Sequence, residues 1–398
     1  MAQRLNLNSV NVARSNTIRD INRQIILNYV REQGPISRAK IAQITELQRS
    51  TVSLIVDELL KLNLFEEIYG ESSGGRPPQL LSLKTSNAVA LGIDLGKKVT
   101  LVGTSDLSGR LLEKQEFPTS RDFDRTMNLI IEAARHFISK NKGSIEGIGV
   151  CLPGLVESWN GRVVNIPHLD WRFPKIIEKL EEATGLPVKV ENDTNAAALA
   201  ELWLGRPEIR NVRDFVVVLI HDGIGTGIVF DGQLYRGKGG VAGEFGHMTI
   251  GSNSPTTCAA GSSDCWEAFA SERAALARYG EKCGSNNGKS KITFAQLVEL
   301  GLAGNKNAES ALKETAHFIG VGISNLIQGL SPEVTIVAGQ FVQAWSLIFN
   351  EIKVGAEKAM CQGFPAVKIM PSTLGAYPTL LGAFSLVLAN KFASFPIN

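Results

Sequence analysis

The sequence predicts two structural parts, an N-terminal winged helix-turn-helix head over residues 1–86 and an α/β body over residues 87–398. In the head, apolar residues recur every three or four positions, which is the spacing of amphipathic helices. After Lys84 the composition changes to short apolar strands separated by glycines. These strands alternate with helical segments, a pattern typical of sheets covered by helices. At 398 residues the chain is long enough for two or three separate cores.

Composition indicates an ordinary soluble globular protein, with 44% hydrophobic and 20% charged residues. No run approaches the roughly 18 apolar residues that cross a membrane, and the N-terminus lacks the apolar core of a secretion signal. The five cysteines are scattered and odd in number, which favours a reducing cytoplasm over a disulfide framework. We therefore expect a cytoplasmic protein without a membrane partner.

Three helices are predicted in the head. The first begins near Thr17, with Asp20 in its first turn, and ends at residues 34–35, which are Gly-Pro. Ser37 is suited to cap a short second helix. A tight turn over residues 46–48 then leads into the third helix. This order of helices is typical of helix-turn-helix proteins.

The third helix has two different faces. Its core-facing side carries apolar residues at positions i, i+3, i+4, i+7 and i+8, which are Val52, Ile55, Val56, Leu59 and Leu60. At its start the opposite side carries short polar and basic side chains, which are Arg49, Ser50, Thr51 and Ser53. A recognition helix presents such side chains because its N-terminal end enters the major groove. We therefore predict that these four residues contact operator DNA.

A hairpin is predicted after the third helix, with strands at residues 65–69 and 80–83. The tip between the strands contains Gly-Arg-Pro, in which Arg76 is suited to enter a narrow minor groove. Arg76 is therefore a fifth predicted DNA contact. The alternative is a small helical dimerisation domain with a solvated loop, but helix order, turn and wing together favour DNA binding.

In the body, several strands and one Ala-rich helix are predicted before a mostly helical C-terminal part. The helix covers residues 195–203, and a Gly-rich turn is expected over residues 223–227. Ligand sites in such folds lie at the ends of strands. The predicted strands cover residues 88–94, 99–105, 110–117, 145–152, 187–191, 216–220, 228–230 and 335–338.

Residues 239–267 form the most distinctive cluster of polar residues. Glu244 and His247 lie on a Gly-rich frame, and Cys258, Cys265 and Glu267 follow. Glutamate accepts hydrogen bonds from hydroxyl groups, neutral histidine can donate or accept, and glycine lets the backbone come close to a ligand. The cluster therefore suits a pocket for a polyhydroxylated ligand.

The body resembles the ROK family (repressors, open reading frames, kinases) along nearly its whole length. The resemblance rests on five motifs in the family's order: Asp-Leu-Gly at 94–96, Pro-Gly at 153–154, Glu-Asn-Asp-Thr-Asn-Ala-Ala at 191–197, Gly-Ile-Gly-Thr-Gly at 223–227, and the block at 244–267. Single motifs of this kind are weak, but the ordered set is specific. The resemblance implies an actin-like body of two lobes that close on a sugar.

The resemblance also implies roles for individual residues. In kinases of the family, the Asp of Glu-Asn-Asp takes the proton from the attacking sugar hydroxyl, and Asp193 matches it. Read alone, Asp193 and Thr194 also suit a capped helix start, and capping and ligand binding are compatible. His247 alone would also suit a satisfied core histidine. The positions that match sugar contacts are Gly154, Asn192, Asp193, Glu244, His247 and Glu267.

A structural zinc site in the family uses the motif His and three Cys residues. Here His247, Cys258 and Cys265 match, whereas Ala260 stands at the position of the middle Cys. Closed structural zinc sites have four ligands. Two outcomes are open: zinc is retained with water or an acid such as Asp264 as the fourth ligand, or zinc is lost and packing holds the loop.

All three nucleotide-binding segments depart from the kinase pattern. Family kinases carry Asp-x-Gly-Gly-Thr in the first loop, where residues 94–98 read Asp-Leu-Gly-Lys-Lys. The second loop usually begins Gly-Thr, which is replaced by His221-Asp222, and a carboxylate there repels phosphate. The third segment is reduced to Ala-Gly-Gln at residues 338–340. We therefore expect neither ATP binding nor catalysis, although the two lysines of the first loop could still hold phosphates.

These patterns together predict a sugar-responsive transcription factor, most simply a repressor that binds operator DNA as a homodimer or homotetramer and is released by a sugar. One alternative is an ATP-dependent sugar kinase with a DNA-binding head, in which Asp193 would be catalytic. A third reading is an interaction module released by a partner protein rather than by a sugar. The sequence leaves the identity of the sugar and of the operator open.

Overall fold

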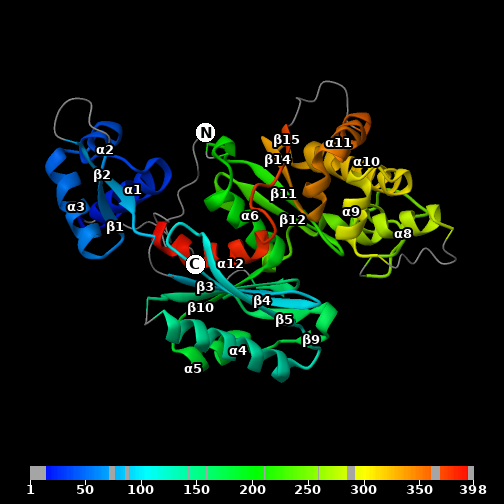
Figure 1. The fold of residues 1–398 in the computed structure, drawn as a ribbon, viewed down its shortest axis with the longest axis horizontal. Coiled ribbons are helices and arrows are strands. Elements are labelled where there is room, and N and C mark those ends of the chain that lie inside the picture. The colour runs from blue at the N-terminus through cyan, green and yellow to red at the C-terminus, as the bar shows by residue number, and fades with distance from the viewer. Residues whose placement is uncertain are drawn as a thin grey trace.

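The structure is a computed structural model, and it describes residues 15–70, 77–85, 89–141, 144–157, 160–209, 211–258, 260–284, 292–359 and 368–392. A small head at the N-terminus lies beside a body made of two α/β lobes (Figure 1). This arrangement confirms the predicted fold class. The predicted boundary between residues 86 and 87 lies outside the described residues. None of the described helices is long and apolar enough to span a membrane.

The head is a winged helix-turn-helix. Ser37 caps the second helix as predicted, because its side chain accepts from the Lys40 amide at 3.2 Å. Glu46 has a left-handed backbone with φ of 59°, which makes the turn before the third helix. The elements of the head are α1 (Ser15–Gln33), α2 (Arg38–Thr45), α3 (Arg49–Lys61), β1 (Phe65–Tyr69) and β2 (Gln79–Leu83).

The lobe nearer the N-terminus, lobe one, contains a five-stranded mixed sheet in the order β10-β6-β3-β4-β5. Its strands are β3 (Ala90–Leu95), β4 (Val99–Ser105), β5 (Leu111–Pro118), β6 (Gly147–Leu152) and β10 (Val188–Asn192). Helices α4 (Phe123–Lys140) and α5 (Ile176–Thr184) pack on it around one apolar core. A small sheet is formed by β7 (Leu155–Val156), β8 (Val163–Ile166) and β9 (Trp171–Arg172).

Lobe two repeats the sheet topology of lobe one, with strand order β13-β12-β11-β14-β15. In each sheet the first three strands in sequence form antiparallel pairs, the fourth strand pairs in parallel with the first, and the fifth strand pairs in parallel with the fourth. This duplication is the two-lobed, actin-like architecture that the resemblance implied. The strands are β11 (Phe215–Ile220), β12 (Ile224–Phe230), β13 (Gln233–Leu234), β14 (Val334–Gly339) and β15 (Lys368–Pro371).

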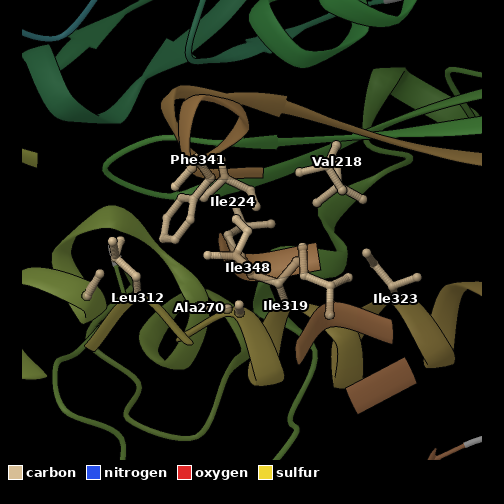
Figure 2. Packing of buried hydrophobic residues seen from close by; sticks show 14 of the residues in the cluster. Val218, Ile224, Ala270, Leu312, Ile319, Ile323, Phe341 and Ile348 are labelled. Carbon is tan, nitrogen blue, oxygen red and sulfur yellow. The ribbon is translucent and has the colours of Figure 1, made fainter. Parts of the chain in front are cut away.

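Helices cover one face of the lobe-two sheet and enclose its main core. Val218 and Ile224 from the sheet face Leu312, Ile319 and Ile323 from a long helix (Figure 2). These side chains are at most 7% exposed, so the lobe is held mainly by buried apolar surface. The helices are α7 (Trp266–Ala270), α8 (Glu272–Lys282), α9 (Phe294–Leu302), α10 (Lys306–Leu330) and α11 (Trp345–Ala359).

Two helices, α6 (Asp193–Leu204) and α12 (Pro378–Phe392), lie side by side between the two sheets (Figure 1). Four residues of α12, Leu380, Phe384, Leu388 and Phe392, belong to one apolar cluster that contains both the head core and residues of lobe one. The C-terminal helix therefore joins the head to lobe one. No pattern in the sequence indicated this connection, because the two segments lie at opposite ends of the chain.

The predicted Gly-rich turn at residues 223–227 is wrong. The turn covers only residues 221–223, and β12 begins at Ile224. A Cβ on Gly225 would lie 2.1 Å from the Thr194 hydroxyl oxygen, and one on Gly227 would lie 2.6 Å from the Ala198 Cβ. The glycines are therefore explained by the close approach of α6 to this strand rather than by a turn.

Candidate functional site

Strand β12 brings sequence motifs of the two lobes to one place. On one side, the Thr194 hydroxyl of α6 lies against Gly225. On the other side, the Thr226 hydroxyl donates to the Gly243 carbonyl at 2.7 Å. A Cβ on Gly246 would meet the Ile224 carbonyl oxygen at 2.1 Å. The segment with Asp193 and the segment with Glu244 and His247 therefore flank the same short strand.

The start of α6 forms the lobe-one side of the candidate site. The Asn192 side chain caps the helix by accepting from the amides of Thr194 at 2.9 Å and Asn195 at 3.1 Å. Its amide nitrogen donates to the Gly154 carbonyl at 3.2 Å. Asp193 also accepts from the Thr194 amide, at 2.8 Å. The predicted helix start is therefore present, but the capping residue is Asn192 rather than Asp193 or Thr194, and the same side chain ties the helix start to Gly154.

The buried carboxyl groups of Asp193 and Asp94 lie close enough for the charge of Asp193 to affect Asp94. Burial raises the pKa of Asp193 above its usual value, against the hydrogen bonds from Thr194. Burial also raises the pKa of Asp94 to about 6, with the Asp193 charge acting in the same direction and a hydrogen bond from Thr379 acting against both. Asp94 lies on β3, and the sequence predicted it only as part of the first nucleotide-binding segment. Its pairing with Thr379 joins that loop to the start of α12.

Glu267 lies in lobe two at the start of α7 and is 5% exposed. Its carboxylate accepts from the Arg273 guanidinium at 2.9 Å and from the Ile224 amide at 3.2 Å. Arg273 also donates to the Asp222 carbonyl, at 2.6 Å. A buried carboxylate needs such partners to stay charged. Arg273 therefore fixes Glu267 beside the glycine-rich strand, a role that the sequence analysis missed.

Glu244 and His247 lie on the surface of lobe two. The Glu244 side chain is 69% exposed, and its carboxylate oxygen lies 3.9 Å from the His247 Nε2 atom. Both residues belong to the short helical turn Glu244–His247. Because the Glu244 carboxylate is exposed rather than buried, it can accept a hydrogen bond from a ligand hydroxyl.

His247 also belongs to a possible metal site. Its ring nitrogen and the sulfur atoms of Cys258 and Cys265 all lie within 4.8 Å of one another. Both cysteines are buried, and Cys265 packs as the residue before α7. Ala260 is exposed, and Asp264 does not join this group of donor atoms. The geometry fits a three-ligand site whose fourth position would be open to water.

Two histidines that were not predicted as site residues also lie near these carboxylates. Burial and the Lys97 ammonium lower the pKa of His168, whereas the charges of Glu267 and Asp193 act in the opposite direction. Burial lowers the pKa of His221, but the Glu272 carboxylate, 3.6 Å away, and the charge of Asp193 both raise it. The pKa of His221 is therefore above its usual value. His168 follows β8, where the sequence offered no motif to mark it.

The two nucleotide-loop segments are joined by ion pairs. The Lys98 ammonium lies 3.4 Å from the Asp222 carboxylate, and the Lys97 ammonium lies 4.0 Å from it. The lysines belong to lobe one and Asp222 to lobe two. These groups are partly exposed, so each pair contributes little stability. Their position matters more, because side chains of opposite charge meet at the two segments that the resemblance to family kinases assigns to phosphate binding.

The start of α3 forms the candidate nucleic-acid interface. Arg49 and Ser50 are exposed, and Thr51 and Ser53 are half-buried. Leu54, which was not predicted as a contact, is 69% exposed on the same helix. An exposed leucine on a recognition helix can contact a thymine methyl group. The predicted wing contact, Arg76, lies outside the described residues.

The head and body define a class of protein: a winged helix-turn-helix joined to a two-lobed sugar-kinase fold. The sequence matches the ROK family over residues 90–390, so the chain belongs to the ROK family.

Its relatives include both regulators and kinases. It is 31% identical over 385 residues to the xylose repressor of Bacillus spizizenii, covering 95% of this chain and 98% of that protein. It is 26% identical to the DNA-binding transcriptional dual regulator NagC of Escherichia coli, with 93% of each chain covered.

Solved structures show the same division. A ROK family transcriptional regulator, described as a homologue of the E. coli MLC protein, superposes with a TM-score of 0.76 at 25% identity and covers 94% of this chain and 98% of its own. A ROK family glucokinase from Streptomyces griseus, in complex with glucose and AMPPNP, gives a TM-score of 0.67 at 28% identity. The superposition with the glucokinase covers 98% of the glucokinase but 75% of this chain. Of these two structures, the regulator spans nearly the whole chain and the glucokinase about three quarters of it.

Proposed function

We propose that this protein is a sugar-responsive transcriptional regulator, and specifically a repressor that a sugar ligand releases from operator DNA. The observation that carries the proposal is the presence, in one chain, of a winged helix-turn-helix head and a body that keeps the family's sugar-side residues. The xylose repressor and NagC, both similar over more than nine-tenths of this chain, support it. Xylose, which the name of the first relative contains, is a candidate for the ligand here.

The proposed sugar contacts are Gly154, Asn192, Asp193, Glu244, His247 and Glu267. Carboxylates and amides of this kind bind a polyol through several hydrogen bonds, and closure of the lobes would complete the set. A ligand changes operator affinity only if it binds one arrangement of the lobes and heads better than another.

Catalysis is not part of the proposal. Phosphoryl transfer needs glycine-rich loops around the ATP phosphates and a bound Mg²⁺, whereas here Lys97, Lys98 and Asp222 occupy the loops and pair with one another. The alternative is a sugar kinase with a DNA-binding head, which the glucokinase neighbour favours. In that case Asp193 would be the general base.

The deciding experiment is a thermal-shift screen of the protein against monosaccharides and sugar phosphates, with and without Mg-ATP. A ligand that binds only the native state raises the melting temperature by mass action. We expect a sugar to do so without ATP, and the same sugar to release the protein from operator duplexes selected from random DNA. ADP formation with that sugar, abolished by Asp193→Asn, would instead establish the kinase.

Operator binding requires a homodimer or a homotetramer in this proposal. Two copies of the head would read half-sites separated by about one helical turn of DNA, or a multiple of it. Analytical ultracentrifugation with and without an operator duplex tests the oligomeric state, and a monomer on DNA would contradict it.

Replacing Arg49 with alanine should weaken operator binding by about 1–3 kcal/mol, because an arginine at the start of a recognition helix reaches base edges or phosphates. The measurement is fluorescence anisotropy with labelled operator at several salt concentrations. The sugar-induced thermal shift should remain, since α3 is remote from the candidate sugar site. Arg213→Ala is the matched control, because that arginine is 67% exposed on lobe two. Equal losses for both variants would rule out a specific contact of Arg49.

We further propose that His247, Cys258 and Cys265 bind zinc. Their donor atoms are already within 4.8 Å of one another, and two soft sulfur ligands favour zinc among the common cellular metals. When bound, the metal would tie the turn with Glu244 to the start of α7. Elemental analysis should find about one zinc per chain, and Cys258→Ala should remove it and lower the melting temperature. Cys283→Ala, at an exposed cysteine outside the triad, should change neither value. Absence of metal in the unmodified protein would contradict the proposal.

A further inference from the structure

One cluster of side chains joins the head to both central helices. The Arg31 guanidinium of α1 lies 4.7 Å from the centre of the Trp203 ring and 4.8 Å from the centre of the Phe392 ring. The two rings are themselves 6.3 Å apart. Beside them, the Asn28 side chain donates to the Phe392 carbonyl at 2.7 Å. We call Arg31, Trp203 and Phe392 the head contact.

Of the helices that reach the head contact, α6 begins at the candidate sugar site, and α12 begins beside Asp94, which is close enough to Asp193 to be affected by its charge. Helix α6 starts with Asp193 and has Trp203 at its other end. Helix α12 has Thr379 in its first turn, where the hydroxyl donates to Asp94, and it ends at Phe392. Helices of 12 and 15 residues extend roughly 18 and 22 Å, so each spans the distance from the site to the head as one rigid element.

The two helices pack too closely to move independently. A Cβ on Gly382 of α12 would lie 2.2 Å from the Ala196 carbonyl oxygen of α6. A Cβ on Gly149 of β6 would lie 1.8 Å from the Ala383 carbonyl oxygen. The backbone of α12 is therefore in direct contact with that of α6 at Gly382 and with that of β6 at Gly149. Close-packed interfaces of this kind shift as units rather than deform.

We propose that the head contact transmits ligand binding from the sugar site to the DNA-binding head. Ligand bound at Asn192 and Asp193 would displace the starts of α6 and α12, and the ends of these helices would move Trp203 and Phe392 under Arg31. The head then changes its orientation relative to the body. This inference rests on the proposed function, since it names how the same sugar site is coupled to DNA.

Trp203 is the residue to test, because it lies on the body and its replacement removes no DNA contact. In Trp203→Leu, the ratio of operator dissociation constants with and without saturating sugar should fall toward one, by about fivefold or more. Sugar affinity, measured by calorimetry, should stay within about twofold of the unmodified protein. Trp203→Phe keeps an aromatic face for Arg31 and should retain most of the ratio.

Trp345→Leu is the matched control. Trp345 stacks on Phe349 at 5.2 Å on α11, in lobe two, away from the head (Figure 1). This variant loses an equivalent ring but should keep the full sugar response. Melting curves show whether each variant folds. An unchanged ratio in a folded Trp203→Leu protein would overturn the proposal.

A second measurement separates this inference from the proposed function, because it needs no sugar. Coupling is reciprocal, so operator DNA bound by the head should change hydrogen exchange in residues 193–204 and 378–392 of the unmodified protein, and much less in Trp203→Leu. If no sugar releases the unmodified protein, the proposed function fails, and the exchange data alone decide the inference. No change in exchange on DNA binding would overturn it.

Discussion

Replacing Asp193 with asparagine is expected to weaken sugar binding by roughly 10–100-fold, because a hydrogen bond to a charged acceptor is worth about 1.5–3 kcal/mol. The amide keeps the size of the side chain and its oxygen can still accept from the Thr194 amide, so α6 should keep its start. Operator affinity without sugar should be unchanged. Isothermal titration calorimetry measures the first quantity and anisotropy the second.

Asp124→Asn provides the control for this substitution. Asp124 is also an aspartate in the first turn of a helix, α4, and it pairs with Lys179 at 2.6 Å on the surface of lobe one. Its replacement should alter helix stability to a similar small extent and leave sugar binding intact. If Asp193→Asn binds sugar as tightly as the unmodified protein, Asp193 is only a helix-start residue and the proposed site is misplaced.

Replacing Glu201 with glutamine is expected to stabilise the protein at pH 8 by about 2–4 kcal/mol. Glu201 lies on α6, is 2% exposed and has both carboxylate oxygens buried, with Ser372 and Arg206 as the polar groups that act on them. Burial raises its pKa from 4.5 to about 7, against the effects of Ser372 and Arg206. The uncharged amide of glutamine resembles the protonated acid that this environment favours.

The pH dependence follows from the direction of this shift. The folded protein holds the proton on Glu201 up to about pH 7, whereas the unfolded chain releases it near 4.5. The contribution of protonated Glu201 to the free energy of unfolding is therefore fully present below pH 4.5 and is lost as the pH rises through 7. Urea unfolding of both proteins at several pH values should give curves that meet near pH 4.5 and separate toward pH 8.

Glu357→Gln is the control, because the Glu357 side chain is 61% exposed on α11 and is hydrated in both states. It should change stability little at any pH. A difference between the Glu201→Gln protein and the unmodified protein that is constant with pH would show that Glu201 is already paired or hydrated in solution, contrary to the structure.

Local patterns in the sequence predicted much of the fold. The Ser37 cap, the apolar stripe from Val52 to Leu59 and the strand at residues 65–69 all appear where they were expected. Such features depend on side chains within a few positions of one another, so the sequence carries them directly. The ordered motifs of the body likewise identified its family, which the match over residues 90–390 bears out.

Long-range packing explains what the sequence analysis missed. The glycines at residues 225 and 227 were expected in a turn, but they lie in β12 because Thr194 and Ala198 of α6 press against them. Arg273 could not be recognised as the partner of Glu267, nor Thr379 as the partner of Asp94, since no local pattern marks either pair. Each pair forms only after separate elements have packed.

The sequence by itself determined the class of the protein: a helix-turn-helix head, an α/β body and a set of sugar-side motifs. Hydrophobic periodicity predicted the head because it acts over short stretches of chain, whereas the two-lobed body and its sugar-side motifs followed from the resemblance to the ROK family. Only the tertiary structure decided that Lys97 and Lys98 face Asp222 and that Arg31 rests on Trp203 and Phe392. These contacts depend on how sheets, central helices and head pack together, because that packing sets which distant residues meet.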